Sequence, residues 1–287
     1  MCFIVRFYRN ERLRFLQKDE QIKVGMTIKL YNFPQSTCSQ KVRLVLWEKG
    51  IEFLDRPINS KAQEHLSDWY LKLNPNGVVP TLEHDGDIVI DSSVIIEYLD
   101  EVFESVSLTP KDAVSRAHMR KWLRYFEEVP TPAIRVPSFN QYLSKRFDKL
   151  SDEEFQDFVD NHPIRKHFFK KMRKKQGFDD FETDNAVDRL RQTLAVMDKG
   201  LIKDGGPWLM GEKLTLADYC IVPTLDRMRD LGLVSVWDEF PRITEWFKNI
   251  QSRDAYLKTF YKGTRLTEIY DGVDLGMNDN SAKVVFD

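Results

Sequence analysis

One stretch of the chain, residues 73–92, reads as a turn, a strand, a tight hairpin and a second strand. It begins with the turn-forming run Asn74-Pro75-Asn76-Gly77, and it places Asp85-Gly86 between two apolar segments. An Asp-Gly pair in that setting is a strong signal for a two-residue hairpin. Pro80 lies inside the first strand, where it has no N–H for the ladder, so we expect it at an edge or after a cis bond. A cis bond would leave the backbone of Val79 open to an extended, peptide-like ligand.

The apolar pattern around this stretch predicts alternating strands and helices. The expected elements are a strand over 28–31, a helix over 41–49, a strand over 52–58, a helix over 62–73, the two hairpin strands and a helix over 92–102. This β-α-β-α-β-β-α order predicts a mixed four-stranded sheet with helices packed on it. After about residue 107 the strand signals stop, and the pattern predicts helices only.

The helical half contains its own signals for where helices begin and end. Three prolines, at positions 130, 132 and 137, are expected to break or kink the helix predicted over 111–128. Ser151-Asp152-Glu153-Glu154 has the spacing of a capping box that opens another helix. The basic segment 166–175 predicts a solvated helix and the acidic segment 179–184 a loop, before a long amphipathic helix over 184–201.

Composition limits the classes of function. Hydrophobic residues make up 42% of the 287 residues, with 31% charged and 12% aromatic, which is typical of a soluble globular protein. The net charge of -2 argues against a nucleic acid or an anionic membrane as partner, and no apolar run is long enough to span a membrane. Cys2, Cys38 and Cys220 lie far apart and form no metal-binding spacing. We therefore expect no metal and a reducing, cytoplasmic compartment.

A second motif lies at Gly211-Glu212-Lys213-Leu214-Thr215-Leu216-Ala217-Asp218. Thr215 and Asp218 stand three residues apart at the start of an apolar helix, so each side chain can cap the free backbone N–H of the other. We interpret this pair as a folding element rather than as catalytic residues.

The two motifs together resemble those of the glutathione transferases, and the chain is more closely similar to the bacterial lignin β-aryl etherases within that group. The second resemblance covers residues 26–261 and includes the insertion that holds the capping box and the basic helix. Between Glu127 and Phe147 the chain departs from the pattern. The matching segments are Leu30-Tyr31-Asn32-Phe33, Glu48-Lys49-Gly50, Ser67-Asp68-Trp69, His84-Asp85-Gly86, Glu97-Tyr98-Leu99 and Arg116-Ala117-His118-Met119-Arg120.

The resemblance implies a fold of α/β plus all-α type. Residues 26–105 would form a thioredoxin-like glutathione-binding domain, and residues 108–265 a helical substrate-binding domain. Residues 1–25 are expected to lie outside the fold, with Met26 as a candidate start and an organelle-targeting arm as the alternative. Residues 266–287 would form a C-terminal tail, and the chain would pair as a homodimer.

Glutathione is an extended tripeptide, so the resemblance implies an edge that receives it. The backbone of Val79, before Pro80, would pair with the cysteinyl unit in the manner of an added strand. Ser92 at a helix start would hold the γ-glutamyl carboxylate, and Asp91 would face the ammonium group. The alternative for Asp91 and Ser92 is a plain helix cap.

The glutathione thiol must ionise to react. A helix N-terminus and a hydroxyl donor both favour a thiolate, which points to the start of the first helix. Counting back from Lys49-Gly50, Ser36 falls where serine-type members of the family place the activating serine, and Ser39 matches a serine of the etherases. An ordinary loop serine remains the alternative for each, with backbone N–H groups or Asn32 as donors instead. Cys38 lies two positions away, so covalent cysteine chemistry is not expected.

The substrate implied by the resemblance is an aromatic electrophile with a leaving group such as phenoxide. Trp122 and Phe126 are the candidates to contact it, although their helix could turn them toward the core instead. Two rival classes remain: a non-catalytic glutathione-binding or ligand-carrier protein, and a glutaredoxin-like oxidoreductase. The second would need a cysteine at position 36 or a CxxC pair, and the chain has neither.

Overall fold

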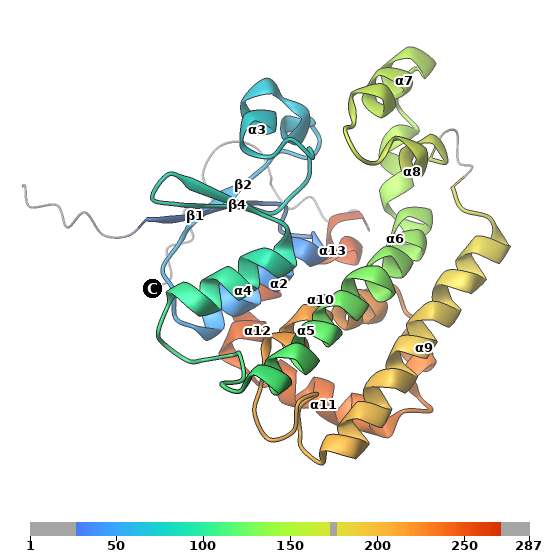
Figure 1. The fold of residues 1–287 in the computed structure, drawn as a ribbon. Coiled ribbons are helices and arrows are strands. Elements are labelled where there is room, and N and C mark those ends of the chain that lie inside the picture. Colours follow the sequence, from blue (N-terminus) through green and yellow to red (C-terminus); the bar gives the residue numbers. More distant parts are fainter. Residues whose placement is uncertain (1–26, 173–176, 271–287) are drawn as a thin grey trace, which may run out of the picture.

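A computed structural model describes residues 27–172 and 177–270 of the chain. The predicted extension over residues 1–25 lies outside the described residues, as does the predicted tail 266–287 beyond Tyr270. The first part of that tail, Leu266–Tyr270, is a helix instead, with Leu266 buried in the main core. Four strands form one mixed sheet in the order β2-β1-β3-β4 (Figure 1). The strands are β1 (Ile28–Asn32), β2 (Leu54–Pro57), β3 (Thr81–His84) and β4 (Asp87–Ile90). β1 runs parallel to β2, and the other two pairs are antiparallel, as the element order predicts.

Helices cover both faces of this sheet. α2 (Thr37–Glu48) and α4 (Ser92–Val102) lie on one face, and the short α3 (Asp68–Leu73) lies on the other (Figure 1). Successive residues of β1 serve the two faces, because Leu30 joins the main core and Tyr31 joins a smaller cluster with Tyr70 and Val79.

The helix predicted over 62–73 is wrong at its start. The chain forms turns and the 3-10 helix η1 (Glu64–Leu66) before α3, and Gln63 adopts a left-handed conformation with φ 53°. The Asn59 side chain accepts the N–H of Ala62, and the Glu64 carboxylate accepts the N–H of Asn59. Such local bonds to side chains compete with the helical ladder.

The hairpin and its proline follow the sequence expectation. The Val79–Pro80 bond is cis, and Asp85 and Gly86 both have positive φ, at 51° and 95°. Two positive φ values in a two-residue loop match the twist of paired strands. Position 77 requires a glycine, since a Cβ there would lie 2.9 Å from the Leu66 side chain.

The rest of the described chain is helical. The longer helices are α5 (Ala113–Glu128), α6 (Pro130–Gln141), α7 (Asp152–Asn161), α9 (Asp180–Asp204), α10 (Leu216–Asp230) and α11 (Pro241–Gln251). The shorter ones are η2 (Leu143–Phe147), α8 (Lys166–Lys170), η4 (Val234–Trp237), α12 (Asp254–Thr259) and α13 (Leu266–Tyr270). None of the described helices combines the length and the apolarity needed to cross a membrane.

Two sequence expectations need correction in this half. The prolines after α5 do more than break it, because Pro130 opens α6 and Pro137 lies inside that helix. The acidic segment predicted as a loop is the first turn of α9, where Asp179 caps the N–H of Glu182 and Glu182 caps that of Asp179. Acidic side chains favour a helix N-terminus for this reason. The capping box at Ser151 is present as expected.

Asp218 is the polar centre of the helical half. Its buried carboxylate accepts the backbone N–H groups of Thr215 and Leu209 and the indole N–H of Trp246, each at 2.9 Å. The Thr215 hydroxyl also donates to it, at 3.1 Å. Asp218 therefore caps α10, as the sequence motif predicts, and also ties the loop at Leu209 and helix α11 to that cap.

Asp218→Ala should lower the free energy of unfolding by about 3 kcal/mol, since the buried N–H groups of Thr215, Leu209 and Trp246 and the Thr215 hydroxyl would lose their acceptor. Chemical denaturation with a fluorescence readout measures the change. Asp112→Ala is the matched control, because Asp112 caps α5 at an exposed end and its loss should lower the stability much less. Equal losses in the two variants would contradict the central role of Asp218.

Candidate active site

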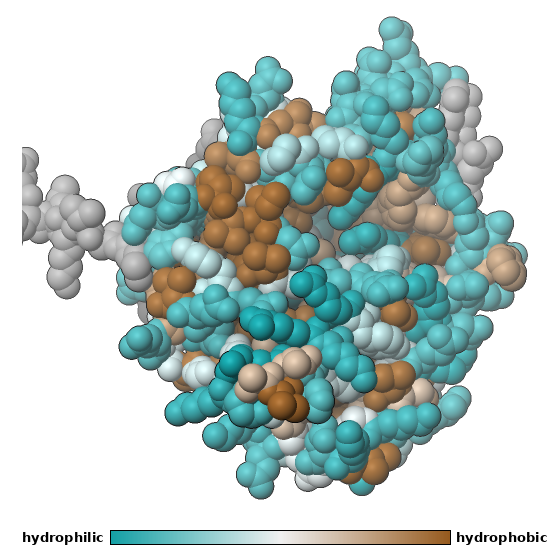
Figure 2. All heavy atoms as spheres, in the orientation of Figure 1, coloured by the Kyte–Doolittle hydropathy of each residue, from teal (hydrophilic) through white to brown (hydrophobic). Residues whose placement is uncertain are grey.

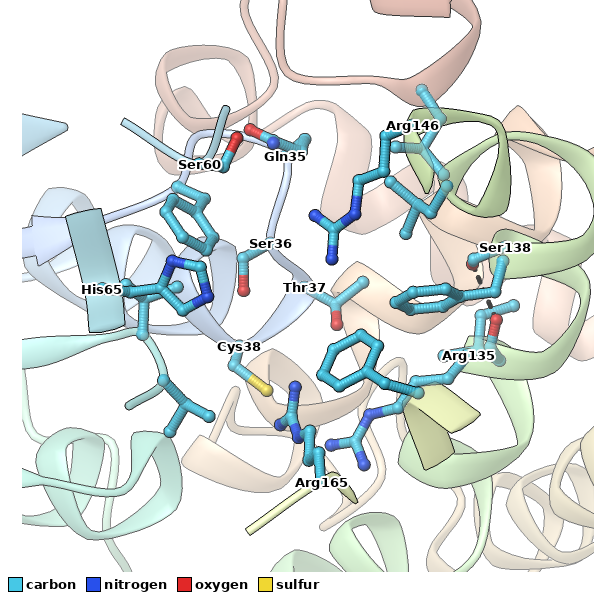
Figure 3. Close-up of a pocket in the computed structure, with 18 of the residues that line it drawn as sticks. Gln35, Ser36, Thr37, Cys38, Ser60, His65, Arg135, Ser138, Arg146 and Arg165 are labelled. Carbon is cyan, nitrogen blue, oxygen red and sulfur yellow. Dashed lines mark hydrogen bonds between the residues drawn. The ribbon is translucent and has the colours of Figure 1, made fainter. Parts of the chain in front are cut away.

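A cleft lies between the sheet half and the helices that follow α5. Figure 2 shows the surface hollowed at this place, between α3 and α7. One wall is the start of α2, with Gln35, Ser36, Thr37 and Cys38, and the loop before β3, with Gly77, Val78 and Val79. The opposite wall comes from α6 and from residues 142–178, which we call the insertion: Ile134, Arg135, Ser138, Phe139, Leu143, Arg146, His162, Arg165 and Phe169 (Figure 3).

Ser36 caps the helix that opens into this cleft. Its backbone is extended, with φ -76° and ψ 122°, and its hydroxyl oxygen accepts the N–H of Ser39 at 3.4 Å. The hydroxyl hydrogen is not used by this contact and can be donated into the cleft, which Ser36 lines. Ser36 therefore has the placement of a donor to an anion at a helix N-terminus.

Ser39 is placed differently. Its side chain is fully buried within α2, and its hydroxyl finds no hydrogen-bond partner among the described residues. Ser39 is not part of the cleft lining. Of the two serines considered from the sequence, the structure brings only Ser36 to the cleft.

Val79 presents backbone groups at the edge of the cleft. No hydrogen bond among the described residues uses its N–H or its C=O. Thr81 pairs with Ile90 in the sheet. Pro80 precedes the first of these residues and Asp91 follows the second, so Pro80 and Asp91 lie at the same end of the hairpin. The two expected contact regions for glutathione, the Val79 backbone and the Asp91-Ser92 helix start, thus lie at the same end of the sheet.

Asp91 and Ser92 sit just outside the lining of the cleft. Asp91 is exposed, has φ 73°, and caps α4 by accepting the N–H groups of Ser93 and Val94 at 2.9 and 3.2 Å. A left-handed conformation at a residue other than glycine costs about 1–3 kcal/mol and concentrates at functional sites. Ser92 is buried, and its hydroxyl oxygen accepts a hydrogen bond from Lys41 at 3.2 Å. The carboxylate of Asp91 remains open to solvent.

Trp122 and Phe126 do not face the cleft. Phe126 is fully buried in the main core, and Trp122 stacks on it with ring centroids 5.2 Å apart. Trp122 also packs on α9, where a Cβ at Gly200 would lie 2.9 Å from its ring. The expectation that these two residues hold the substrate is thus corrected, because their helix turns them toward α9. Phe139 and Phe169 supply the aromatic wall instead.

The cleft also carries positive charge that sequence reasoning missed. Arg135, Arg146 and Arg165 line it, and Figure 3 shows their guanidinium groups directed into it. Burial lowers the pKa of Arg146, and burial together with Arg135 lowers the pKa of Arg165 to about 10. The sequence does hold one signal, because Arg135 interrupts the apolar run from Ala133 to Val136. An arginine in such a run must find either a buried partner or a ligand.

Two histidines line or border the same positive region. Burial, with Arg146 and Arg165 nearby, lowers the pKa of His65 to about 4. Burial with the same two arginines and His65 lowers the pKa of His162 to about 3. Their Nδ1 atoms have no hydrogen-bond partner among the described residues, and their ring centroids lie 6.1 Å apart. Both rings are therefore neutral at pH 7.

Cys38 lies next to the positive groups without forming a disulfide. Its sulfur points toward Arg165 in Figure 3. No group of three histidine, cysteine or acidic residues within the described part of the chain could hold a metal ion.

Comparison with known proteins agrees with this architecture. Residues 35–102 match the N-terminal domain of glutathione S-transferases, and residues 162–254 match the C-terminal domain. Protein LigF of Sphingobium sp. is 32% identical over 247 residues, which cover 84% of this chain and 95% of LigF. The crystal structure of beta-etherase LigF from the same organism gives a TM-score of 0.75 and covers 82% of this chain and 99% of that one.

Two further relatives extend the comparison. Glutathione S-transferase 1 of Dianthus caryophyllus is 46% identical over 234 residues, covering 80% of this chain and 87% of the relative. Maleylacetoacetate isomerase of Pseudomonas aeruginosa is 30% identical over 220 residues, covering 75% and 87%. The fold and the cleft thus define an enzyme that uses a peptide thiol as co-substrate. The chain belongs to the glutathione S-transferase family, and its co-substrate is glutathione.

The two histidines should make the protein sensitive to acid. The unfolded chain binds their protons near the ordinary pKa of 6.5, whereas the folded chain binds them only near pH 4 and pH 3. Stability is therefore present above about pH 6.5 and falls as the pH is lowered through this window, by up to about 1 kcal/mol per pH unit for each histidine. Urea unfolding at several pH values between 4 and 8 measures the slope.

His162→Asn should flatten that slope, whatever its effect on stability at neutral pH. His118→Asn is the matched control, because His118 is exposed on α5 and its loss should leave the slope unchanged. A slope that is the same in all three proteins would refute the assignment of acid sensitivity to the cleft.

Proposed function

We propose that the protein transfers glutathione to an aromatic electrophile, with Ser36 as the donor that stabilises the thiolate. The observation that carries the proposal is the placement of Ser36 as cap of α2 in the same cleft as the unpaired backbone of Val79. The cysteinyl unit of glutathione would pair with Val79, and its γ-glutamyl end would lie toward Asp91 and Ser92. These contacts hold the sulfur near the N-terminus of α2, where the helix dipole favours an anion.

The proposed reaction is the cleavage of a β-aryl ether. The glutathione sulfur forms a bond to the carbon that bears the aryloxy group, and the bond from that carbon to oxygen breaks. The electron pair leaves with the phenoxide, which takes a proton from solvent. The similarity to beta-etherase LigF supports this electrophile, and it extends over nearly the whole of that chain.

Ser36→Ala should lower turnover by about ten- to a hundredfold, since one hydrogen bond to the thiolate is worth about 1.5–3 kcal/mol. The pKa of bound glutathione, followed by thiolate absorbance, should rise in parallel. Ser39→Ala is the matched control, because the Ser39 hydroxyl is buried outside the cleft, and it should keep both values.

Asp91→Ala separates binding from activation. It should weaken the binding of glutathione while the acidity of the bound thiol stays nearly unchanged, because Asp91 would face the ammonium group and not the sulfur. Calorimetry with glutathione measures the first effect. If Ser36→Ala retained wild-type turnover and thiol acidity, the serine assignment would fail and backbone N–H groups would replace it. Asn32 would not, because it is buried and its amide donates to Leu30 and Asp55.

We also propose that the protein is a cytoplasmic homodimer, with the sheet half of one copy against the helical half of the other. Ile88 on β4 and Val94 on α4 are exposed, and Figure 2 shows apolar side chains gathered over these two elements. Light scattering at micromolar concentration should give twice the monomer mass of 33.9 kDa. Val94→Lys should shift the protein to the monomer. Val114→Lys is the matched control, because Val114 is an exposed valine of α5, outside the proposed interface, and an added charge there should leave the dimer intact. A wild-type monomer would refute the pairing.

A further inference from the structure

Three arginines in the cleft lack an ion-pair partner among the described residues. The charge of Arg135 does reach Glu127, but that carboxylate is paired with Lys41. Among the described residues, no carboxylate forms an ion pair with Arg135, Arg146 or Arg165. The Nε atom of Arg146 is buried and has no hydrogen-bond partner. Its guanidinium lies 4.6 Å from the ring centroid of Phe147 and 5.9 Å from that of Phe139. Aromatic faces attract a cation but leave its N–H donors unused.

Other arginines that are withdrawn from solvent in this molecule do form ion pairs. Each has a carboxylate within ion-pair distance: Arg43 pairs with Asp55, Arg227 with Asp230 at 3.4 Å, and Arg265 with Asp226 at 3.1 Å. A cation removed from water without a partner is strongly destabilising. The cleft therefore gathers positive charge that the folded chain leaves for a ligand to neutralise.

Glutathione alone does not balance this charge. Its γ-glutamyl carboxylate is accompanied by an ammonium group and would lie toward Asp91, outside the lining of the cleft. The thiolate and the glycyl carboxylate bring two negative charges against three arginines. At least one guanidinium is left for the second substrate.

We propose that the electrophilic substrate carries a carboxylate, held by Arg135 and Arg165; this rests on the proposed function of the same cleft. The two guanidinium groups lie close together beside Cys38, across the cleft from Ser60 (Figure 3). Planar guanidinium groups bind carboxylates through paired hydrogen bonds, which fixes orientation as well as charge. Phe139 and Phe169 lie on the same wall and would contact the aromatic ring. The insertion, which supplies Arg165, thus determines which electrophiles the enzyme accepts.

A matched pair of ethers tests the proposal. One is a β-aryl ether ketone whose leaving phenol bears a para-carboxylate, and the other has a para-carboxamide there. The carboxamide withdraws electrons more strongly, so its phenol is the better leaving group. A wild-type kcat/KM that is about tenfold or more higher for the carboxylate would therefore report recognition of charge and not leaving-group ability.

Variants of the two arginines test whether they cause the preference for the carboxylate. Arg165→Gln and Arg135→Gln should each reduce the ratio of the two kcat/KM values severalfold, and Arg165→Lys should restore part of it. Arg191→Gln is the matched control, because Arg191 is an exposed arginine of α9 that pairs with Asp188, and it should keep the wild-type ratio. If an arginine variant raised the Kd for glutathione and kept the ratio, that arginine would bind the glycyl carboxylate instead.

The remaining outcomes separate the two proposals. Cleavage of both ethers with a ratio near one would overturn the carboxylate proposal and leave the proposed function standing. If neither ether were cleaved, the proposed function would fail, and calorimetry of para-hydroxybenzoate with the glutathione-loaded protein would decide the rest. Binding that is lost in Arg165→Gln would support the carboxylate site, and no binding to the wild type would overturn it.

Discussion

The burial of helix α2 between the two halves is the constraint on which the site depends. Charged residues of α2 are withdrawn from solvent and paired with a different element each. Lys41 pairs with Glu127 of α5, Arg43 with Asp55 of β2, and Glu48 with Arg253 before α12. Lys49, just after the helix, pairs with Asp100 of α4 at 2.7 Å. In the Lys49–Asp100 pair both side chains are buried, and breaking such a pair costs about 3–5 kcal/mol, so the position of α2 is strongly specified.

The proposed chemistry would use the end of this fixed helix. Ser36 caps α2 at the point where its free N–H groups face the cleft, and a hydroxyl held in that way needs little reorganisation to meet a thiolate. Lys41, one turn further along, also donates to the hydroxyls of Ser92 and Ser93 at the start of α4. One buried side chain thus connects the helix that would activate the thiol to the helix start that would hold the other end of glutathione. Glu127 fixes that side chain from the helical half.

Local sequence determined most of the fold, and the family resemblance supplied the proposed glutathione contacts. The hairpin and the cap at Asp218 depend on residues close together in the chain, so turn and capping preferences were enough to predict them. For Pro80 the residues alone left a sheet edge or a cis bond open, and the structure has the cis bond. Ser36 and Ser39 were both candidates from the family resemblance, and only the fold shows that Ser36 caps α2 at the cleft while Ser39 is buried. Long-range packing decided the rest. From the sequence, the aromatic residues of α5 could face the cleft or the core. In the structure Trp122 packs against Gly200 of α9, so these residues face the core.

The arginine-lined wall of the cleft could not be predicted because it is assembled from segments that are far apart. Arg135 comes from α6 and Arg165 from the insertion, which forms a separate apolar cluster around Phe158 and Phe169. The insertion contacts the sheet half at Gly77, where a Cβ would lie 3.0 Å from Pro163. A larger residue at position 77 would push the insertion away from the loop that leads into Val79. The close approach of Pro163 to Gly77 therefore helps to hold the insertion, and Arg165 with it, against the wall formed by the start of α2 and the loop before β3.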